Sequence, residues 1–110
     1  MYSLLMEYRA NISANQSSDT ELVKVAFGEV IERHRIDADF DQRPFSKIVG
    51  ISNSHLRKIE AGATCPTLIT VWKLASVLEV DPGTLVTEAN EVVLTRKMKQ
   101  SHRKPPKANL

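Results

Sequence analysis

Cysteine, glycine and aromatic residues are scarce in this chain of 110 residues, and each scarcity excludes a class of protein. The chain has one cysteine, four glycines and aromatic side chains at only 5% of its positions. A single thiol forms no disulfide within the chain and no multi-thiolate zinc site, which is typical of a reducing compartment. No apolar run approaches the roughly 20 residues of a membrane-spanning helix. We therefore expect a cytoplasmic protein with no membrane segment.

Motifs of the common enzyme classes are missing as well. The sequence contains no P-loop, no glycine-rich dinucleotide turn and no Gly-x-Ser-x-Gly elbow. No two of its three histidines have the spacing of zinc ligands. We therefore expect no enzymatic activity, no bound metal and no cofactor.

Charge is distributed unevenly along the chain. Residues 96–110 contain six bases and no acid, so residues 1–95 carry a net charge of −4. Within that acidic part, residues 42–73 hold five bases against the single acid Glu60. This segregation favours one face that binds a polyanion, although scattered bases also occur on ordinary solvated surfaces.

Composition divides the chain into three parts. Residues 11–20 are polar and turn-forming, and a Pro-Pro pair stands among bases at 105–106. We expect a flexible N-terminal arm over 1–19, a folded domain over 20–91, and a C-terminal extension with a basic tail over 92–110. Within the arm, Tyr2 to Arg9 can form a short amphipathic helix.

Five helices are predicted for the folded domain, because apolar residues recur at helical spacing and alternation is rare. Asp41 and Ser52 are suitable N-caps, whereas Gly50 and Gly62 end the second and third helices. The predicted helices run from about 20 to 35, 42 to 49, 52 to 61, 66 to 78 and from 82 onward. Residues 92–95 either extend the fifth helix or form a strand that pairs with a partner chain. The predicted fold class is all-α.

The helical spacing also assigns side chains to the core. Phe27 and Ile31 share a face of the first helix with His34, for which we expect a packed, hydrogen-bonded histidine. Trp72 lies beside the apolar stripe of the fourth helix and is expected to be a half-buried core or interface residue. The remaining core positions are Phe45, Ile48, Val49, Leu56, Ile59, Leu68, Val71, Leu74, Ala75, Leu78, Leu85 and Val86.

The second helix, the turn at Gly50 and the third helix have the geometry of a DNA-binding helix-turn-helix. Because Leu56 and Ile59 point inward, the third helix presents amide, hydroxyl, imidazole and basic side chains outward. These groups are the ones that bind base edges and phosphates. The N-terminus of the second helix adds free backbone amides that favour a phosphate. The candidate DNA-binding residues are Gln42, Arg43, Ser52, Asn53, Ser54, His55, Arg57 and Lys58.

The sequence resembles the Cro and lambda-repressor type (XRE-like) helix-turn-helix family. The resemblance covers Phe27 to Leu85 without a gap, a little over half the chain. The residues that carry it are Gly28, Ile31, Arg35, Gln42, Phe45, Gly50, Ser52, Leu56, Ile59, Glu60, Gly62, Pro66, Leu68 and the run from Leu74 to Pro82. This sequence departs from the family pattern at Ser46, where alanine is usual, at Pro44 inside the second helix, and at His34.

The resemblance implies a five-helix domain whose third helix enters the major groove. It implies that Gln42 bonds a phosphate and braces the third helix, and that Asn53 and Ser54 read bases. Lys58, one turn further on, is implied to reach another base or a phosphate. Arg35 and Glu60 occupy positions where family members form a structural ion pair between the first and third helices.

These observations predict a sequence-specific DNA-binding transcription regulator of the repressor type, with double-stranded DNA as its partner. A homodimer is expected by analogy, and the spare apolar residues for its seam are Tyr2, Leu4, Leu5, Met6 and Val92 to Leu94. Phage-type repressor, antitoxin and restriction-modification controller remain open within this class. The alternative is an adaptor or antitoxin that mainly binds protein, with a toxin or a polymerase as the partner.

Overall fold

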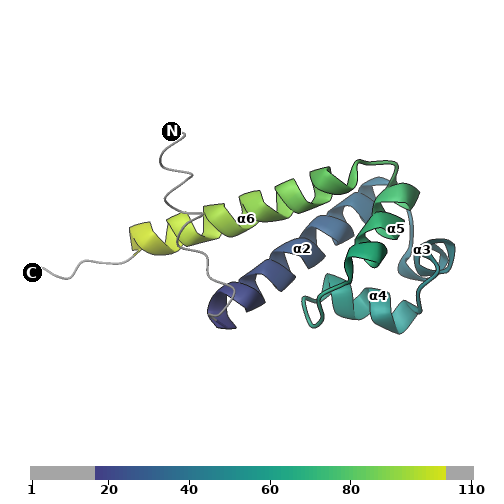
Figure 1. Cartoon of the computed structure of the whole chain (residues 1–110), viewed down its shortest axis with the longest axis horizontal. Coiled ribbons are helices and arrows are strands. Elements are labelled where there is room, and N and C mark those ends of the chain that lie inside the picture. The colour runs from purple at the N-terminus through teal and green to yellow at the C-terminus, as the bar shows by residue number, and fades with distance from the viewer. Residues whose placement is uncertain (1–16, 104–110) are drawn as a thin grey trace, which may run out of the picture.

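Residues 17–103 are described by a computed structural model and form five helices, labelled α2 to α6 in Figure 1. These helices are α2 (Ser17–Asp37), α3 (Gln42–Val49), α4 (Asn53–Glu60), α5 (Leu68–Leu78) and α6 (Pro82–Arg103). No strand occurs within this range, so the predicted all-α class is confirmed. The expected positions of α3 and α4 are reproduced, whereas α2 is longer than predicted at both ends.

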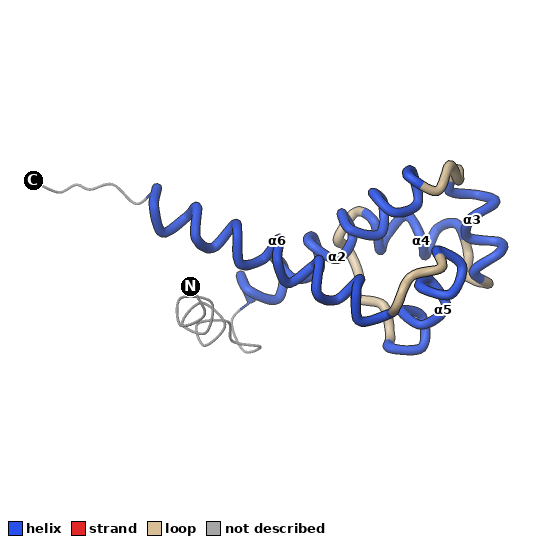
Figure 2. Tube along the Cα trace, turned by 90° about the horizontal axis from the view of Figure 1, so that it is seen from above, coloured by secondary structure: helices blue, strands red, loops and turns tan. Residues whose placement is uncertain are grey.

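The two long helices, α2 and α6, lie side by side and run in opposite directions (Figure 1). The three short helices gather at one end of this pair, as the view from above also shows (Figure 2). Helix α2 contacts α4 and α5, and α6 contacts α5, so both long helices pack against the short ones. No helix in the described range is both long and apolar enough to cross a membrane.

A single apolar core joins the five helices. Phe45 of α3, Leu56 of α4, Leu74 of α5 and Leu85 of α6 are fully buried, together with Ile31 of α2. Phe40, just before α3, packs its ring at 5.4 Å from the ring of Phe45. This contact fixes the direction in which the chain enters α3, in the manner of a hydrophobic staple.

Three apolar side chains expected in the core are instead exposed, and Trp72 is more exposed than expected, which corrects the assignment made from spacing. Leu68, Ile48 and Val86 are 67%, 59% and 53% exposed, and Trp72 is 56% exposed rather than half-buried. Each lies at the edge of its helix's apolar stripe, where no second helix covers it. Helical spacing identifies which side chains share a face. The packing of the neighbouring helices determines how many of those side chains are buried.

The alternatives at residues 92–95 are settled in favour of a helix. These residues belong to α6, which continues past residue 91 to Arg103. Val93 and Leu94 are 2% and 4% exposed, so this segment packs within the chain and offers little apolar surface to a dimer partner. The predicted arm up to residue 16, with Tyr2, Leu4, Leu5 and Met6, and the tail from residue 104 lie outside the described residues.

Ion pairs connect α6 to α2 along their length. Glu88 of α6 accepts hydrogen bonds from Arg33 at 2.9 Å and interacts with Nε2 of His34 at 2.7 Å. The pKa of the Glu88 carboxyl lies below its ordinary value, mainly because of its hydrogen bond with His34. His34 is thus the partly buried, hydrogen-bonded histidine that its place on the inner face predicts.

Gly28 allows α2 to approach the end of α4 closely. A Cβ at this position would lie 2.4 Å from the carbonyl oxygen of Ile59 and 2.7 Å from that of Glu60. Both atoms belong to the backbone, so no side chain can rotate to relieve the overlap. The crossing of α2 over α4 therefore requires glycine here.

We expect Gly28→Ala to destabilise the protein by about 1 to 3 kcal/mol, because α2 must move away from α4 to admit the methyl group. Urea unfolding followed by circular dichroism measures the effect. Gly83→Ala is the matched control, since a Cβ there lies 3.5 Å from the nearest atom, in ordinary contact. Equal stability of Gly28→Ala and Gly83→Ala would contradict the close approach.

Candidate nucleic-acid interface

Helices α3 and α4 are joined by a tight turn that the local sequence specifies. Gly50 has φ +89°, a left-handed conformation that glycine adopts without steric cost. The carbonyl of Ser46 accepts hydrogen bonds from the backbone N–H groups of Gly50 and Ile51 at 2.9 and 3.0 Å. Ser52 then caps α4, its Oγ accepting from the backbone N–H of His55 at 3.0 Å. The predicted helix, glycine turn and helix unit is present as expected.

Two of the three departures from the family pattern, Ser46 and Pro44, are accommodated within α3. The hydroxyl of Ser46 is buried and donates to the carbonyl of Arg43 at 2.9 Å, so it needs no partner outside α3. Pro44 lies in the first turn of α3, where a missing N–H removes no helical hydrogen bond. Asp41 has the extended backbone of an N-cap, but its side chain makes no capping bond.

A buried ion pair holds α4 against α2. Arg35 Nε and Nη2 donate to the two carboxylate oxygens of Glu60 at 2.7 and 3.1 Å, in a bidentate arrangement. The side chains are only 9% and 4% exposed. The hydrogen bond to Glu60 raises the pKa of Arg35 above its ordinary value, against the lowering effect of burial. The structure thus brings together the two residues for which the resemblance implied a structural pair.

Two further contacts tie this pair to α3 and to the segment before it. Gln42 Nε2 donates to Glu60 Oε1 at 2.8 Å, and Arg35 Nη1 donates to the carbonyl of Phe40 at 2.7 Å. Gln42 therefore connects the start of α3 to the last residue of α4. The bracing of α4 that the resemblance implied for Gln42 occurs through this contact with Glu60.

Polar and basic side chains occupy the outer face of α3 and α4. Arg43, Ser54, Arg57 and Lys58 are exposed, and His55 is half-buried. No ion pair within residues 19–100 engages Arg43, Arg57 or Lys58. These cations therefore have no ion-pair partner that competes with a polyanion.

Asn53 differs from its neighbours on α4. Its side chain is half-buried, and its carbonyl oxygen is buried without a hydrogen-bond partner. The bidentate bond of an asparagine to adenine uses both the oxygen and the nitrogen of the amide. Asn53 must therefore turn its amide outward to read a base in this way.

A shallow hollow at the start of α4 adds Lys47 to the residues that the sequence predicted for this surface. Arg43 and Lys47 of α3 line this hollow together with Asn53 of α4, and both cations are exposed. Lys47 follows Arg43 by four residues, so the two side chains share a face of α3. The i, i+4 spacing of the two bases was the signal that could have identified Lys47.

The basic residues at the end of α6 have structural partners instead. Arg96 bonds Glu29 at 2.7 Å, and Lys97 bonds Asp19 at 2.7 Å. Both contacts join α6 to α2, and Figure 1 places this end of α6 away from α4. Two of the six bases of residues 96–110 are thus neutralised within the fold.

The sequence profile of the helix-turn-helix family matches residues 31–85, which is half of the chain. The chain therefore belongs to the helix-turn-helix family, and it is a DNA-binding transcription regulator. The matched segment runs from Ile31 of α2 to Leu85 of α6 and includes all of α3, α4 and α5. A comparison with curated protein sequences finds no match.

Two solved structures are similar to this chain. The clp gene regulator ClgR from Corynebacterium glutamicum has a TM-score of 0.70 at 15% identity, over 74% of this chain and 87% of that chain. The restriction-modification controller protein C.AhdI from Aeromonas hydrophila has a TM-score of 0.54 at 26% identity, over 56% and 92% respectively. The likeness to ClgR supports the fold over a longer part of the chain than the family match.

We expect Glu60→Gln to destabilise the protein by about 3 to 5 kcal/mol, because it leaves the buried guanidinium of Arg35 without a counter-charge. Urea unfolding at neutral pH is the measurement. Glu29→Gln is the control: it breaks the ion pair with Arg96, whose side chains are 40% and 44% exposed, and should cost at most about 1 kcal/mol. If both variants lose the same small amount, the buried pair is not a main support of α4.

Proposed function

We propose that this protein is a repressor that binds double-stranded DNA sequence-specifically, with α4 in the major groove. The observation that carries the proposal is the exposed polar and basic face of α4, held rigidly by the bonds of Glu60 to Arg35 and Gln42. Rigid support matters because base readout depends on side chains held in register with base edges. Occupancy of an operator that overlaps a promoter excludes the polymerase and so blocks transcription.

The readers and the backbone contacts have separate roles in this proposal. Asn53 and Ser54 at the start of α4 contact base edges, and Lys58 one turn on reaches a further base or a phosphate. Arg43 and Lys47 flank the hollow at the start of α4 and bind the DNA backbone as phosphate contacts. The remaining candidates, Ser52, His55 and Arg57, support the same face as a cap, a groove contact and a cation.

We propose further that the DNA-bound form is a homodimer. Leu68, Ile69 and Trp72 are 67%, 65% and 56% exposed, and their spacing on α5 makes them neighbours on one surface. Exposed apolar surface that includes tryptophan is typical of protein interfaces. In a two-fold dimer this patch meets its own copy, and the two α4 helices then read half-sites about 34 Å apart. The protein acts by binding, without catalysis, on DNA in the cytoplasm.

We expect Asn53→Ala to cost about 1 to 3 kcal/mol on the preferred site and to relax specificity at one base pair. Arg43→Ala is the matched comparison: it should weaken binding to all duplexes alike and flatten the dependence on salt. Selection of duplexes from a random library defines the site, and titration at several salt concentrations measures both variants. Full affinity and unchanged preference of Asn53→Ala would show that Asn53 does not read a base.

We expect Ile69→Asp to convert the dimer into a monomer, because a charge within the apolar patch must be desolvated in the interface. Light scattering measures the molar mass, with Thr95→Asp as the control, since Thr95 is exposed and lies on α6, away from the patch. A parent that is monomeric, or a dimer that persists in Ile69→Asp, contradicts the proposed seam. The patch would then be assigned to a different protein partner.

A further inference from the structure

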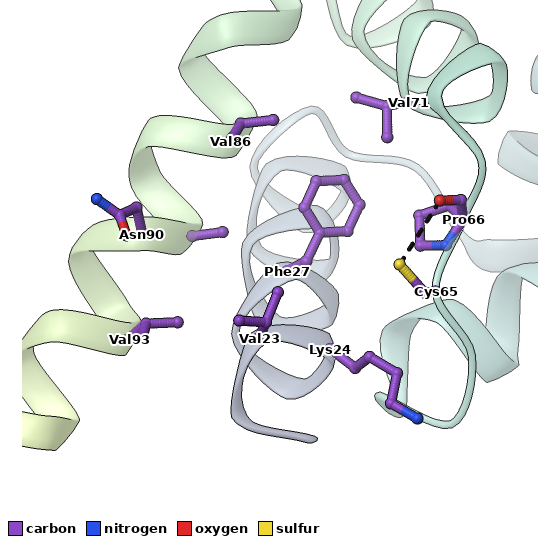
Figure 3. A pocket seen from close by; sticks show the side chains of 10 residues that line it. Val23, Lys24, Phe27, Cys65, Pro66, Val71, Val86, Asn90 and Val93 are labelled. Carbon is purple, nitrogen blue, oxygen red and sulfur yellow. Dashed lines mark hydrogen bonds between the residues drawn. The ribbon is translucent and has the colours of Figure 1, made fainter. Parts of the chain in front are cut away.

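An apolar groove of about 230 Å³ lies between α2, α6 and the loop that precedes α5 (Figure 3). Phe27 lies at the middle of the groove, and Val86 and Val93 of α6 stand on one side of it. Cys65 and Pro66 of the loop stand on the other side. None of the lining residues belongs to α3 or α4, so the groove is separate from the proposed DNA-binding face.

The groove has a buried floor and exposed apolar margins. Phe27 and Val93 are 8% and 2% exposed, whereas Val23 and Val86 are 40% and 53% exposed. Val23 is on α2 and Val86 on α6, so two helices contribute apolar surface that nothing in residues 19–100 covers. Continuous apolar surface of this kind marks a site that another chain segment covers.

We propose that residues 2–9 of the same chain dock into this groove as a short amphipathic helix. Seven of the first ten residues are apolar, and they include both tyrosines of the chain. Tyr2, Leu5 and Met6 have the i, i+3, i+4 spacing of one helical face. This face covers the margins of the groove and completes the packing of α6 on α2.

The lengths of the segment and of the groove agree. Eight residues of helix span about 12 Å, and the groove follows α6 from Val86 to Val93, about 10 Å at 1.5 Å per residue. Helix α2 begins at Ser17, and Val23 lies about 9 Å further along its axis. Residues 10–16 span up to about 23 Å when extended, so the connection reaches the groove without strain.

The same chain is favoured over a second copy as the source of the helix. A short connection holds the segment near its groove at an effective concentration in the millimolar range. A second copy reaches such a concentration only in a very concentrated solution. Docking within one chain therefore prevails over docking between chains, because residues 10–16 are long enough to reach the groove.

Cys65 provides a reporter for this docking. It is the only cysteine of the chain, and it lines the groove with an exposed thiol. A docked helix covers the thiol and slows its reaction with a soluble maleimide. The rate of labelling of the full-length protein, relative to that of the chain unfolded in guanidinium, measures how much of the time the groove is covered.

Leu5→Asn and Val86→Asn test the two sides of the contact without adding a charge that would itself alter thiol reactivity. We expect each variant to label about tenfold faster than the parent. A segment held at an effective concentration of about 1 mM and bound with a Kd of about 0.1 mM is docked about nine-tenths of the time, and the substitution releases it. Ser3→Asn and Thr87→Asn are the matched controls and should label like the parent. Val86 and Thr87 are both exposed, so neither change disturbs the core.

The dependence on protein concentration separates the proposed docking from other occupants. Protection that is constant over a wide range of concentration, and that persists in Ile69→Asp, supports docking within one chain. Protection that develops only as concentration rises assigns the groove to a second copy and overturns the proposal. Labelling of the parent as fast as the unfolded chain also overturns it, because the groove is then open.

Discussion

The bidentate bond between Arg35 and Glu60 is the interaction on which the DNA-binding unit depends. It joins the last turn of α2 to the last residue of α4, and Gln42 extends it to the first residue of α3. Burying two charges costs desolvation free energy that their attraction only partly offsets. The pair is therefore better understood as a constraint on geometry, because only one arrangement of the three helices satisfies all its bonds.

The pairing of α2 with α6 supports this constraint from behind. Gly28 permits the close crossing of α2 over α4, and the ion pairs of Glu88, Glu29 and Asp19 align α6 along α2. Acids and bases of the two helices thus neutralise one another within the scaffold. The cations of α3 and α4 have no such partners among the described side chains, which leaves positive charge on the proposed DNA-binding face.

Much of the fold could be predicted because its signals are local. The N-cap at Ser52, the glycine at position 50 and the proline at the start of α6 each act within a few residues, and the helices begin and end near them. The exposures of Leu68, Val86 and Trp72 could not be predicted in this way. They depend on how far neighbouring helices extend over each face, which is a property of packing and not of spacing.

The sequence by itself determined the helices, the turn between α3 and α4, and the identity of the side chains on the outer face of α4, because backbone preferences and helical periodicity act over short distances. Only the tertiary structure decided that Arg96 and Lys97 bind α2, that the oxygen of Asn53 is buried, and that Val23 and Val86 border a groove. These outcomes join residues that lie far apart in the chain or on different helices. Their partners are set by the close packing of α2 against α4 and α6, which no local pattern specifies.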